Sequence, residues 1–422
     1  MIYGGPNYFN PLVFYFMTDT LVLLASLIAL LLGIATGKAW ERYKLKGWQW
    51  IDRRKARESP HYILGLNFLV SNQIDLAIEE LTKAAGLNDD ALEIDLILGN
   101  LYREKGQVSK SIQVHQGLLQ RPRLTPLEHA HVLLCLGLDY KRGGFVDRAF
   151  EAFSEVVRLD PENKYALLNL EKLHEEQHQW KEARLIRERM TEAAGEPDKP
   201  SGQAILAFLE NELGLQALRD SRPDEAMRRF EAAIDMDKQT VPAYLNLGDV
   251  KLSEGQKKAA IETWERILQV SPEKTYLAFS RLEAAYKEIG MPSRFLDLCQ
   301  RLVDANPQDW RARLALGQHM ADSGETAKSI DLMFEALVNN PHGLAIHQSI
   351  WRIFAALDFK AELVDRYVDL TRNSVFYLDP HICMRCRYRS TELLWQCPQC
   401  HEWNTFVEER ITPAEDGETE QL

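Results

Sequence analysis

The chain lacks any overall excess of positive charge. Its 422 residues include 50 Lys and Arg against 62 Asp and Glu, which gives a formal net charge of -12 at pH 7. A protein that binds nucleic acid along its surface needs Lys and Arg to displace counterions from phosphates. We therefore expect no nucleic-acid partner, and positive charge only in local patches.

The chain also lacks two short motifs that mark many active sites. It contains no Gly-rich phosphate-binding loop and no Gly-x-Ser-x-Gly nucleophile elbow. His342 and His347 are five positions apart, so they would not share one helix face as a metal-binding pair. We therefore predict a protein that binds other molecules, is not an enzyme and has no catalytic residue.

Cysteine is scarce, and four of the six cysteines form two pairs, Cys383-x-x-Cys386 and Cys397-x-x-Cys400, with ten residues between the pairs. Two residues between paired cysteines let both sulfurs converge on one ion, and two such pairs are typical of a tetrahedral metal site. Because all four positions are thiolates, none is left open for a substrate. We predict one structural Zn or Fe ion, with zinc preferred. The alternative is two disulfides or idle thiols, which a cytosolic location would disfavour.

The segment around these cysteines, from His381 to about Val407, is too short to fold by apolar burial alone. Metal binding can supply the stability, since a structural zinc ion contributes about 10 to 16 kcal/mol of apparent binding free energy near neutral pH. Five side chains are predicted to cover the metal: Tyr388, Leu394, Trp395, Trp403 and Phe406. The other two cysteines lie in apolar helical patterns and are predicted to be buried core thiols: Cys135 and Cys299.

Long hydrophobic runs are rare as well, but one run is long enough to span a membrane. Leu12 to Ala35 covers 24 residues, in which Asp19 is the only charged residue. About 20 apolar residues are enough to cross the hydrocarbon core of a bilayer. We therefore predict one membrane helix, and a cleaved signal peptide is the alternative.

Charge on the two sides of this run indicates its orientation. Residues 1–18 contain no Lys or Arg, whereas residues 38–57 contain eight Lys or Arg and two acids, a local net charge of +6. Positive charge flanking a membrane helix marks the cytoplasmic side. We predict an outer N-terminus and membrane helix in residues 1–37 and a basic juxtamembrane segment in residues 38–58, with the rest of the chain in the cytoplasm.

The middle of the chain, from about His61 to Phe376, repeats at a period close to 34 residues. Two units show the shared positions: Leu98-Gly99, Tyr102 and Gly106, then Leu136-Gly137, Tyr140, Gly144 and Pro161. This pattern resembles the tetratricopeptide (TPR) repeat, a helical hairpin. The first glycine lets two helices pack closely, the second glycine ends the first helix, and the proline ends the second helix.

We predict an all-α TPR solenoid across residues 59–376, with about nine repeats. Two repeats, near Lys164 and His342, are degenerate, and Gly195–Gln203 is predicted to be a linker or insertion. The first helices of such a stack line a concave surface that usually binds a peptide or another protein. Three histidines within the repeats are predicted to lie at solvated or capping positions: His115, His131 and His174.

A membrane helix, a TPR array and a cysteine module in this order resemble the lipopolysaccharide assembly protein B (LapB) family. The resemblance includes Tyr62-x-x-Gly65-Leu-Asn67 in the first repeat and the ending Leu394-Trp395-Gln-Cys397-Pro-Gln-Cys400-His-Glu-Trp403. It implies that residues 377–409 form a rubredoxin-like metal-binding domain. The remaining residues, 410–422, are acidic and lack aromatics, so a disordered tail is expected.

Two residues depart from the rubredoxin pattern. Arg387 and His401 each follow the second cysteine of a pair, where rubredoxins have glycine. A left-handed backbone there costs a non-glycine residue about 1 kcal/mol. The ten residues between the pairs are also fewer than in electron-transfer rubredoxins. Rubredoxin-like electron transfer is therefore the weaker alternative, beside a generic TPR scaffold for envelope or pilus assembly.

The family resemblance also implies a function. Its members are inner-membrane adaptors of Gram-negative bacteria, with a periplasmic N-terminus and cytoplasmic TPR and metal domains. They work with the protease FtsH to promote degradation of LpxC, and they contact lipopolysaccharide assembly proteins. For this chain we expect the same role, with the metal module rigidifying or capping the array. The oligomeric state stays open, and a homodimer is one possibility.

Overall fold

The computed structural model describes residues 59–87, 92–122, 124–193, 195, 199–356, 361–371 and 381–409. The predicted membrane helix, the basic segment and the acidic tail lie outside these residues. Within the part of the chain that is described, no helix combines the length and the apolar character needed to cross a membrane.

The chain divides into two compact units, residues 1–166 and 167–422. Helices of the first unit are α3 (Pro60–Val70), α4 (Ile74–Ala85), α5 (Leu92–Glu104), α6 (Val108–Leu119), α7 (Pro126–Arg142) and α8 (Val146–Leu159). The helix α9 (Lys164–Glu176) contains the division. Consecutive helices pair as hairpins, as the TPR pattern predicts.

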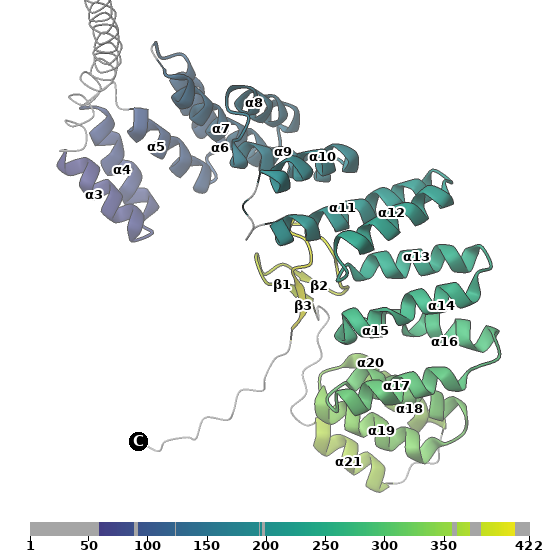
Figure 1. The fold of residues 1–422 in the computed structure, drawn as a ribbon. Helices are drawn as coiled ribbons and strands as arrows, with labels where there is room; N and C mark the ends of the chain where they lie inside the picture. The colour runs from purple at the N-terminus through teal and green to yellow at the C-terminus, as the bar shows by residue number, and fades with distance from the viewer. Residues whose placement is uncertain are drawn as a thin grey trace, which may run out of the picture. The chain divides into compact units, whose positions relative to one another are not determined.

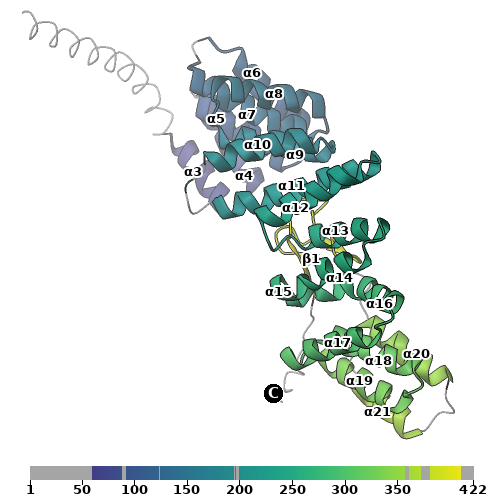
Figure 2. The same ribbon diagram turned by 45° about the vertical axis from the view of Figure 1, so that its right-hand side comes forward.

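The second unit continues the same hairpins, stacked side by side from α11 onward (Figures 1 and 2). Its helices are α10 (Trp180–Glu192), α11 (Lys199–Arg219), α12 (Pro223–Met236), α13 (Val241–Ser253), α14 (Lys257–Glu265), α15 (Ile267–Val270), the 3-10 helix η1 (Pro272–Ala278), α16 (Phe279–Glu288), α17 (Ser293–Ala305), α18 (Trp310–Asp322), α19 (Thr326–Asn339), α20 (Leu344–Ala356) and α21 (Ala361–Thr371). The predicted helical TPR-like array is confirmed.

One predicted boundary, between the segment at Gly195–Gln203 and the helix after it, is wrong. The segment Gly195–Gln203 is predicted to be a linker or insertion, but α11 begins at Lys199, so the second half of the segment belongs to a helix of the array. Gly202 is buried there against Thr191 of α10, and a Cβ on Gly202 would lie 2.3 Å from the Thr191 hydroxyl. The prolines and glycines that suggested a linker therefore belong in part to a close contact between helices.

Glycines close the hairpins in the two ways that the sequence predicts. Gly106 and Gly255 follow the first helices of their pairs with φ angles of 78° and 80°, a left-handed conformation that glycine adopts without strain. Gly137 instead lies where two helices cross, and a Cβ there would meet the Phe153 ring at 2.6 Å. The repeat frame thus sets both where the first helices end and how closely their partners approach.

Replacing Gly248 with alanine will lower the stability of the second unit by about 1 to 3 kcal/mol, because the core there has no room for another methyl group. A Cβ at this position would lie 2.1 Å from Trp264 Nε1. Trp264 is fully buried and donates a hydrogen bond to the Leu245 carbonyl at 3.2 Å, so it cannot move away easily. The thermal unfolding midpoint measures the effect.

Gly117→Ala is the matched control, because Gly117 lies inside α6 with nothing within 4 Å of an added Cβ. Alanine should stabilise that helix by about 0.5 to 1 kcal/mol. Equal effects of the two substitutions would contradict the close packing at Gly248.

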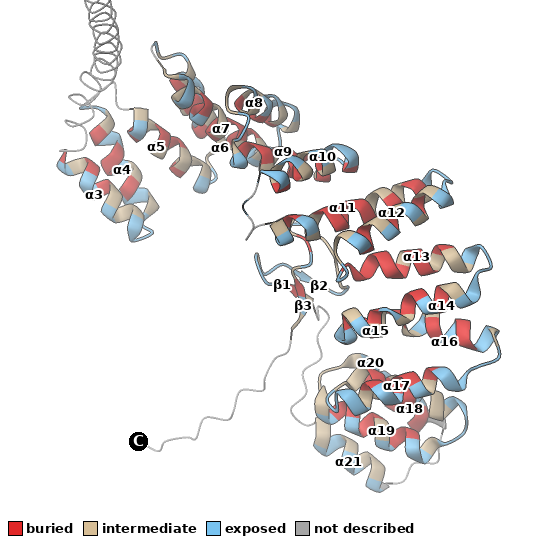
Figure 3. Cartoon of the chain, viewed as in Figure 1, coloured by how far each residue is buried: buried red, intermediate tan, exposed pale blue. Residues whose placement is uncertain are grey.

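Buried residues lie between the helices, and exposed residues face outward (Figure 3). The largest fully buried side chains include aromatic residues at the repeat positions: Trp264, Tyr244, Tyr286, Phe153, Phe230 and Phe334. Cys135 and Cys299 are also buried, as predicted. Burial raises the pKa of Cys135 to about 11 and that of Cys299 to about 12, so both stay thiols at neutral pH.

The prediction for His115 is wrong. This side chain is fully buried in the first unit, where His115 Nδ1 is hydrogen-bonded to Asp139. Asp139 also accepts hydrogen bonds from Arg103 at 2.8 Å and from the Ser111 hydroxyl at 2.6 Å. Because an isolated buried carboxylate would be costly, these donors explain why Asp139 can lie inside the core. The cluster ties α5, α6 and α7 together.

Candidate metal centre and its docking surface

The C-terminal module is a small antiparallel sheet that carries two cysteine loops. Strands β1 (His381–Cys383), β2 (Arg389–Ser390) and β3 (Phe406–Glu408) are ordered β2-β1-β3. One loop, the first knuckle, contains Cys383 and Cys386, and the other, the second knuckle, contains Cys397 and Cys400. The first knuckle connects β1 to β2, and the second knuckle lies between β2 and β3, so a short segment can place four sulfurs together.

The structure brings the four predicted cysteines into one cluster, and their sulfur atoms all lie within 4.8 Å of one another. The Cys383 and Cys400 sulfurs are 3.7 Å apart, and the Cys386 and Cys397 sulfurs are 3.5 Å apart. Four sulfurs bound tetrahedrally to zinc at about 2.3 Å would be separated by about 3.8 Å. The four cysteines are therefore arranged as they would be around a metal ion bound by four thiolates.

The ionisation of the thiols also favours a cation at this site. Burial opposes ionisation of Cys383, but hydrogen bonds from the Thr405 hydroxyl and from backbone N–H groups lower its pKa to about 6. Burial and the neighbouring sulfurs raise the pKa of Cys400 to about 12, and burial also raises that of Cys397. Several thiolates cannot be held this close without a positive charge among them, and a divalent ion supplies it.

The two knuckles share one backbone geometry. Arg387 donates its backbone N–H to the Cys383 carbonyl at 2.9 Å, and His401 does the same to the Cys397 carbonyl at 2.8 Å. Both residues have left-handed backbones, with φ angles of 64° and 55°. The predicted strain at these two positions is therefore present. The His401 side chain contacts Glu176 of α9. Nothing in the structure explains an arginine at position 387.

Replacing Arg387 with glycine will stabilise the module by about 1 kcal/mol, because glycine adopts the left-handed backbone freely. Resistance of the bound metal to a competing chelator, together with thermal unfolding, measures the change. His401→Gly is the comparison: it relieves the same strain but removes the 3.2 Å contact between the side chains of His401 and Glu176, so its net effect should be smaller. A destabilised Arg387→Gly variant would show that the arginine side chain has a contact of its own.

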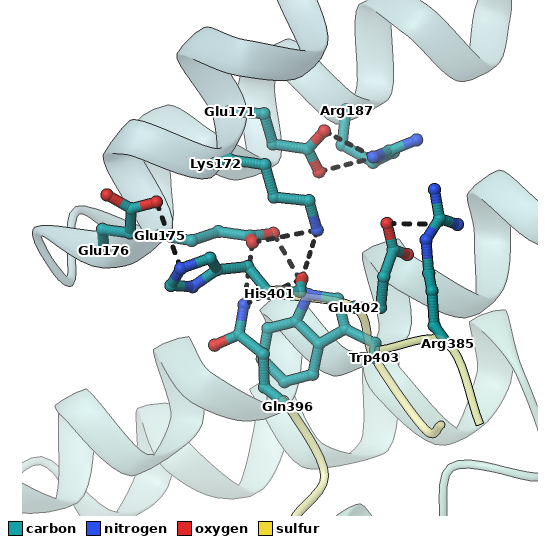
Figure 4. Close-up of polar contacts among 10 residues, drawn as sticks. All are labelled: Glu171, Lys172, Glu175, Glu176, Arg187, Arg385, Gln396, His401, Glu402 and Trp403. Atoms are coloured by element: carbon teal, nitrogen blue, oxygen red, sulfur yellow. Dashed lines mark hydrogen bonds and ion pairs between the residues drawn. The ribbon is translucent and has the colours of Figure 1, made fainter. Parts of the chain in front are cut away.

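The second knuckle binds the array through polar contacts with α9 (Figure 4). Glu175 accepts hydrogen bonds from Trp403 Nε1 at 3.1 Å and from Gln396 Nε2 at 2.8 Å. Lys172 donates to the backbone carbonyl of His401 and lies 3.4 Å from Glu175. The Glu175 side chain is fully buried, so these contacts are specific to the docked module.

Aromatic side chains pack beside these polar contacts. Trp403 stacks on Phe208 of α11, with ring centroids 5.3 Å apart and an interplanar angle of 18°. It also meets Trp180 of α10 edge to face at 6.3 Å. Trp395 lies 6.2 Å from Phe208. We call the array residues that hold the module the docking surface: Lys172, Glu175, Glu176, Trp180 and Phe208.

This packing corrects the predicted apolar cover. Phe406 is buried with the cysteines, and Leu394 packs against them, as expected. Trp395 and Trp403 instead face the array, and they belong to apolar clusters formed with its helices. The sequence could not distinguish an aromatic residue that covers the metal from one that binds a neighbouring surface.

The predicted role of the module as a cap is also corrected. The module contacts the side of the second unit, from α9 to α18, on the surface formed by the first helix of each pair, which we call the inner surface. Besides α9 and α11, Glu408 of β3 binds Arg311 of α18 at 2.9 Å. Lys274 of η1 donates to the Asn404 side chain at 3.1 Å and lies over the Trp395 ring.

A buried ion pair lies behind the docking surface. Arg187 of α10 donates to both carboxylate oxygens of Glu171, one of them at 2.7 Å, and both side chains are buried. Burial raises the pKa of Glu171 to about 7, although Arg187 opposes this shift. Since Glu171 lies one helical turn from Glu175, the pair fixes the part of α9 that receives the second knuckle.

One motif escaped the sequence analysis. His174-Glu175-Glu176-Gln177-His178 has the His-Glu-x-x-His spacing of zinc-binding helices. That spacing needs a continuous helix, but α9 ends at Glu176 and His178 has a left-handed φ of 55°. His174 Nδ1 is bonded to the Gln179 side chain at 2.7 Å, and Glu175 holds the second knuckle. The motif thus serves docking here and does not form a metal site.

Next to the module, the inner surface is hollowed by a groove of about 650 Å³. Its walls come mainly from η1 and from the first helices α16, α18 and α20, with Phe295 of α17 and Met333 of α19. Arg311 lines the groove and also binds Glu408 of the module. The lining is mixed, with apolar and polar side chains that include Phe279, Trp310, Leu314, Ala315, Gln318 and Ile353. Its composition suits an extended polypeptide.

Comparisons with known families match the two kinds of module. A family described as "Rubredoxin metal binding domain" matches residues 381–408. A family described as "Tetratricopeptide repeat" matches residues 211–286. The first match contains all four clustered cysteines, and the second covers α12, α13 and α14.

Similar proteins extend the resemblance to nearly the whole chain. Lipopolysaccharide assembly protein B of Escherichia coli K12 is 26% identical over 386 residues, which cover 91% of this chain and 98% of that protein. The protein of the same name from Haemophilus influenzae is 25% identical over 396 residues, with the same coverage of 91% and 98%. Among solved structures, the TPR2AB-domain:pHSP90 complex of yeast Sti1 covers 75% of this chain and 99% of its own at 15% identity, with a TM-score of only 0.27. The chain is thus similar along nearly its full length to lipopolysaccharide assembly protein B, and the predicted resemblance to that family is confirmed.

Proposed function

We propose that this protein is an adaptor of lipopolysaccharide assembly, attached to the inner membrane with its repeats in the cytoplasm. The observation that carries the proposal is the groove beside the docked metal module, on the inner surface where TPR arrays bind polypeptides. The similarity to lipopolysaccharide assembly protein B supplies the pathway. In this role the protein holds partners together and needs no catalytic residue.

The membrane attachment is part of the proposal. Residues 1–37 would provide the periplasmic N-terminus and the single membrane helix, and residues 38–58 the basic segment on the cytoplasmic side. The sequence pattern of one apolar run followed by a net charge of +6 supports this orientation. The repeats in residues 59–376 and the metal domain in residues 377–409 would then face cytoplasmic partners.

The metal has a structural role in this proposal. Cys383, Cys386, Cys397 and Cys400 would hold one ion, and zinc is preferred to iron because it suits a closed tetrathiolate site without redox chemistry. When bound, the ion cross-links the two knuckles. The second knuckle can then present Trp403 and the His401 carbonyl to α9 in a fixed geometry.

The partners follow from the family resemblance. FtsH would be the protease and LpxC the protein delivered to it, with lipopolysaccharide assembly proteins as further contacts. The direct test is the half-life of LpxC after the protein is depleted from cells. We expect LpxC to persist longer, and an unchanged half-life would contradict the adaptor role.

Filling the groove should have the same effect as depletion. Ala315 is a partly buried residue of the groove wall on α18, so Ala315→Trp will occupy the space that a bound polypeptide needs. In depleted cells that produce this variant, LpxC should persist as long as in cells without the protein. Ala305→Trp, at an exposed position at the end of α17, is the matched control and should restore normal turnover.

Gln318→Lys is a milder change at an exposed position of the same groove. It covers the case in which tryptophan at position 315 disturbs folding, which metal content and thermal unfolding would reveal. Normal LpxC turnover with both folded groove variants would exclude this groove as the partner site.

A further inference from the structure

The first helix of the array, α3, exposes an apolar face. Ile63, Leu64 and Val70 are 52%, 42% and 88% exposed, and they share one side of the helix with Asn67. The 16 residues from Ser59 to Ile74 contain no Asp, Glu, Lys or Arg. A terminal repeat normally turns a polar face outward, because no further repeat covers it. The apolar side of α3 therefore calls for a partner.

Two acidic groups near α3, Glu80 and Asp75, have partners in the same unit. Glu80 binds His61 at 2.7 Å and Lys83 at 2.7 Å, and Asp75 is paired with Lys105. These pairs reduce the repulsion that free carboxylates would exert on a negatively charged surface. The end of the array thus presents apolar side chains with little opposing charge.

The chain immediately before α3 identifies the kind of partner. Residues 38–57 carry a net charge of +6 and include Trp40, Trp48 and Trp50. Basic residues beside a bilayer are attracted to anionic headgroups. Tryptophan favours the boundary between headgroups and acyl chains. An anionic lipid surface therefore complements both the basic segment and the apolar side of α3, which begins directly after it.

We propose that α3 is a lipid-contacting helix, whose Ile63, Leu64 and Val70 enter the headgroup boundary of an anionic bilayer. The inference rests on the proposed membrane attachment, which keeps α3 close to the bilayer. Apolar contact and electrostatic attraction act together here, and such paired signals are what stable surface binding requires. The first repeat would then be held at the membrane surface by its own side chains.

The test uses the full-length protein in nanodiscs of phosphatidylethanolamine and phosphatidylglycerol, with a fluorescent amino acid at position 70. Lipids brominated near the headgroup should quench most of this fluorescence. Val338 of α19 provides the matched control, because it is also a valine and is 65% exposed. A probe at position 338 should keep its fluorescence. Equal quenching at both positions, or none at position 70, would overturn the proposal.

The unquenched outcomes identify what covers α3 instead. A blue-shifted probe that responds to protein concentration would indicate a second copy of the chain. A blue shift independent of concentration would indicate coverage by residues 1–58. Retention of the protein in the nanodisc is measured in the same sample. Retention without quenching would refute lipid contact by α3 while leaving the proposed membrane attachment intact, whereas loss from the disc would refute the attachment.

A substitution completes the test. Val70→Glu, with Ile63→Glu as a second variant, should abolish binding of α3 to phosphatidylglycerol, seen as recovered fluorescence of a probe at position 64. Both positions are exposed, so the fold should persist. Persistent quenching in both variants would contradict an apolar contact with lipid.

Discussion

Replacing Cys397 with serine will release the metal and detach the C-terminal module from the array. A structural zinc site contributes about 10 to 16 kcal/mol of apparent binding free energy, and a module of this size has little else to hold its knuckles together. Cys397 belongs to the knuckle that carries His401 and Trp403, so its loss removes the docking contacts as well. Metal per chain, measured by mass spectrometry, should fall from one to near zero. Cys383→Ser, in the first knuckle, should behave alike.

Cys299→Ser is the matched control for these variants. Cys299 is fully buried in the array core and lies outside the cysteine cluster. Its substitution buries a hydroxyl and so lowers the stability of the array, but the metal should remain at one ion per chain. Full retention of metal in Cys383→Ser or Cys397→Ser would show that the four sulfurs do not act as one site.

Replacing Glu175 with alanine will detach the module while the metal stays bound. The substitution leaves Lys172, the Trp403 N–H and the Gln396 amide without their shared acceptor in a buried place. Removing one partner of a buried ion pair typically costs about 3 to 5 kcal/mol. Hydrogen exchange should therefore accelerate in the second knuckle and in α9, and the metal content should not change.

Glu176→Ala, at the neighbouring position, is the matched control. Glu176 pairs with His401 at 3.2 Å, but its side chain is 22% exposed, so water can replace part of the contact. Its effect on exchange should be much smaller than that of Glu175→Ala. Equal effects would mean that docking depends on general negative charge along α9 and not on the buried acceptor.

Cys397→Ser and Glu175→Ala together separate two functions of the second knuckle. Its cysteines belong to the cysteine cluster, and its other residues bind the array. In cells, both variants should lengthen the lifetime of LpxC if the docked module shapes the partner site. A normal lifetime with a detached module would confine the adaptor role to the groove alone.

The repeat glycines and the cysteine spacing made most of the fold and the cysteine cluster predictable. Gly137 and Gly248 mark helix crossings because any side chain would collide there, and such steric rules act over short distances along the chain. The cysteine pairs are equally local, since two residues between cysteines already bring both sulfurs to one side. Arg387 and His401 show the predicted left-handed backbones for the same reason.

The docking of the module was not predictable, because its partners are far apart in the sequence. Trp403 meets Glu175 across 228 positions, and Gln396 meets it across 221. No local sequence pattern tells whether Trp403 packs against the array or covers the metal site. His115 failed for a similar reason, since its acceptor Asp139 lies on another helix, 24 positions away.

One pattern did carry usable information. The sequence around His174 has the spacing of a zinc-binding helix, which is unusual for a solvated repeat position. The structure assigns the acid of this sequence, Glu175, to the docking surface. A polar pattern that conflicts with its repeat frame is thus a useful sign of a contact from outside the repeat.

The most direct measurement of the central claim is hydrogen exchange of the full-length protein before and after the metal is removed with a chelator. If the metal centre holds the module on the inner surface, removal will accelerate exchange in α9, α10 and α11, which carry the docking surface, and leave α12 unchanged. Unchanged exchange in α9 and α11 after complete metal loss would contradict the claim.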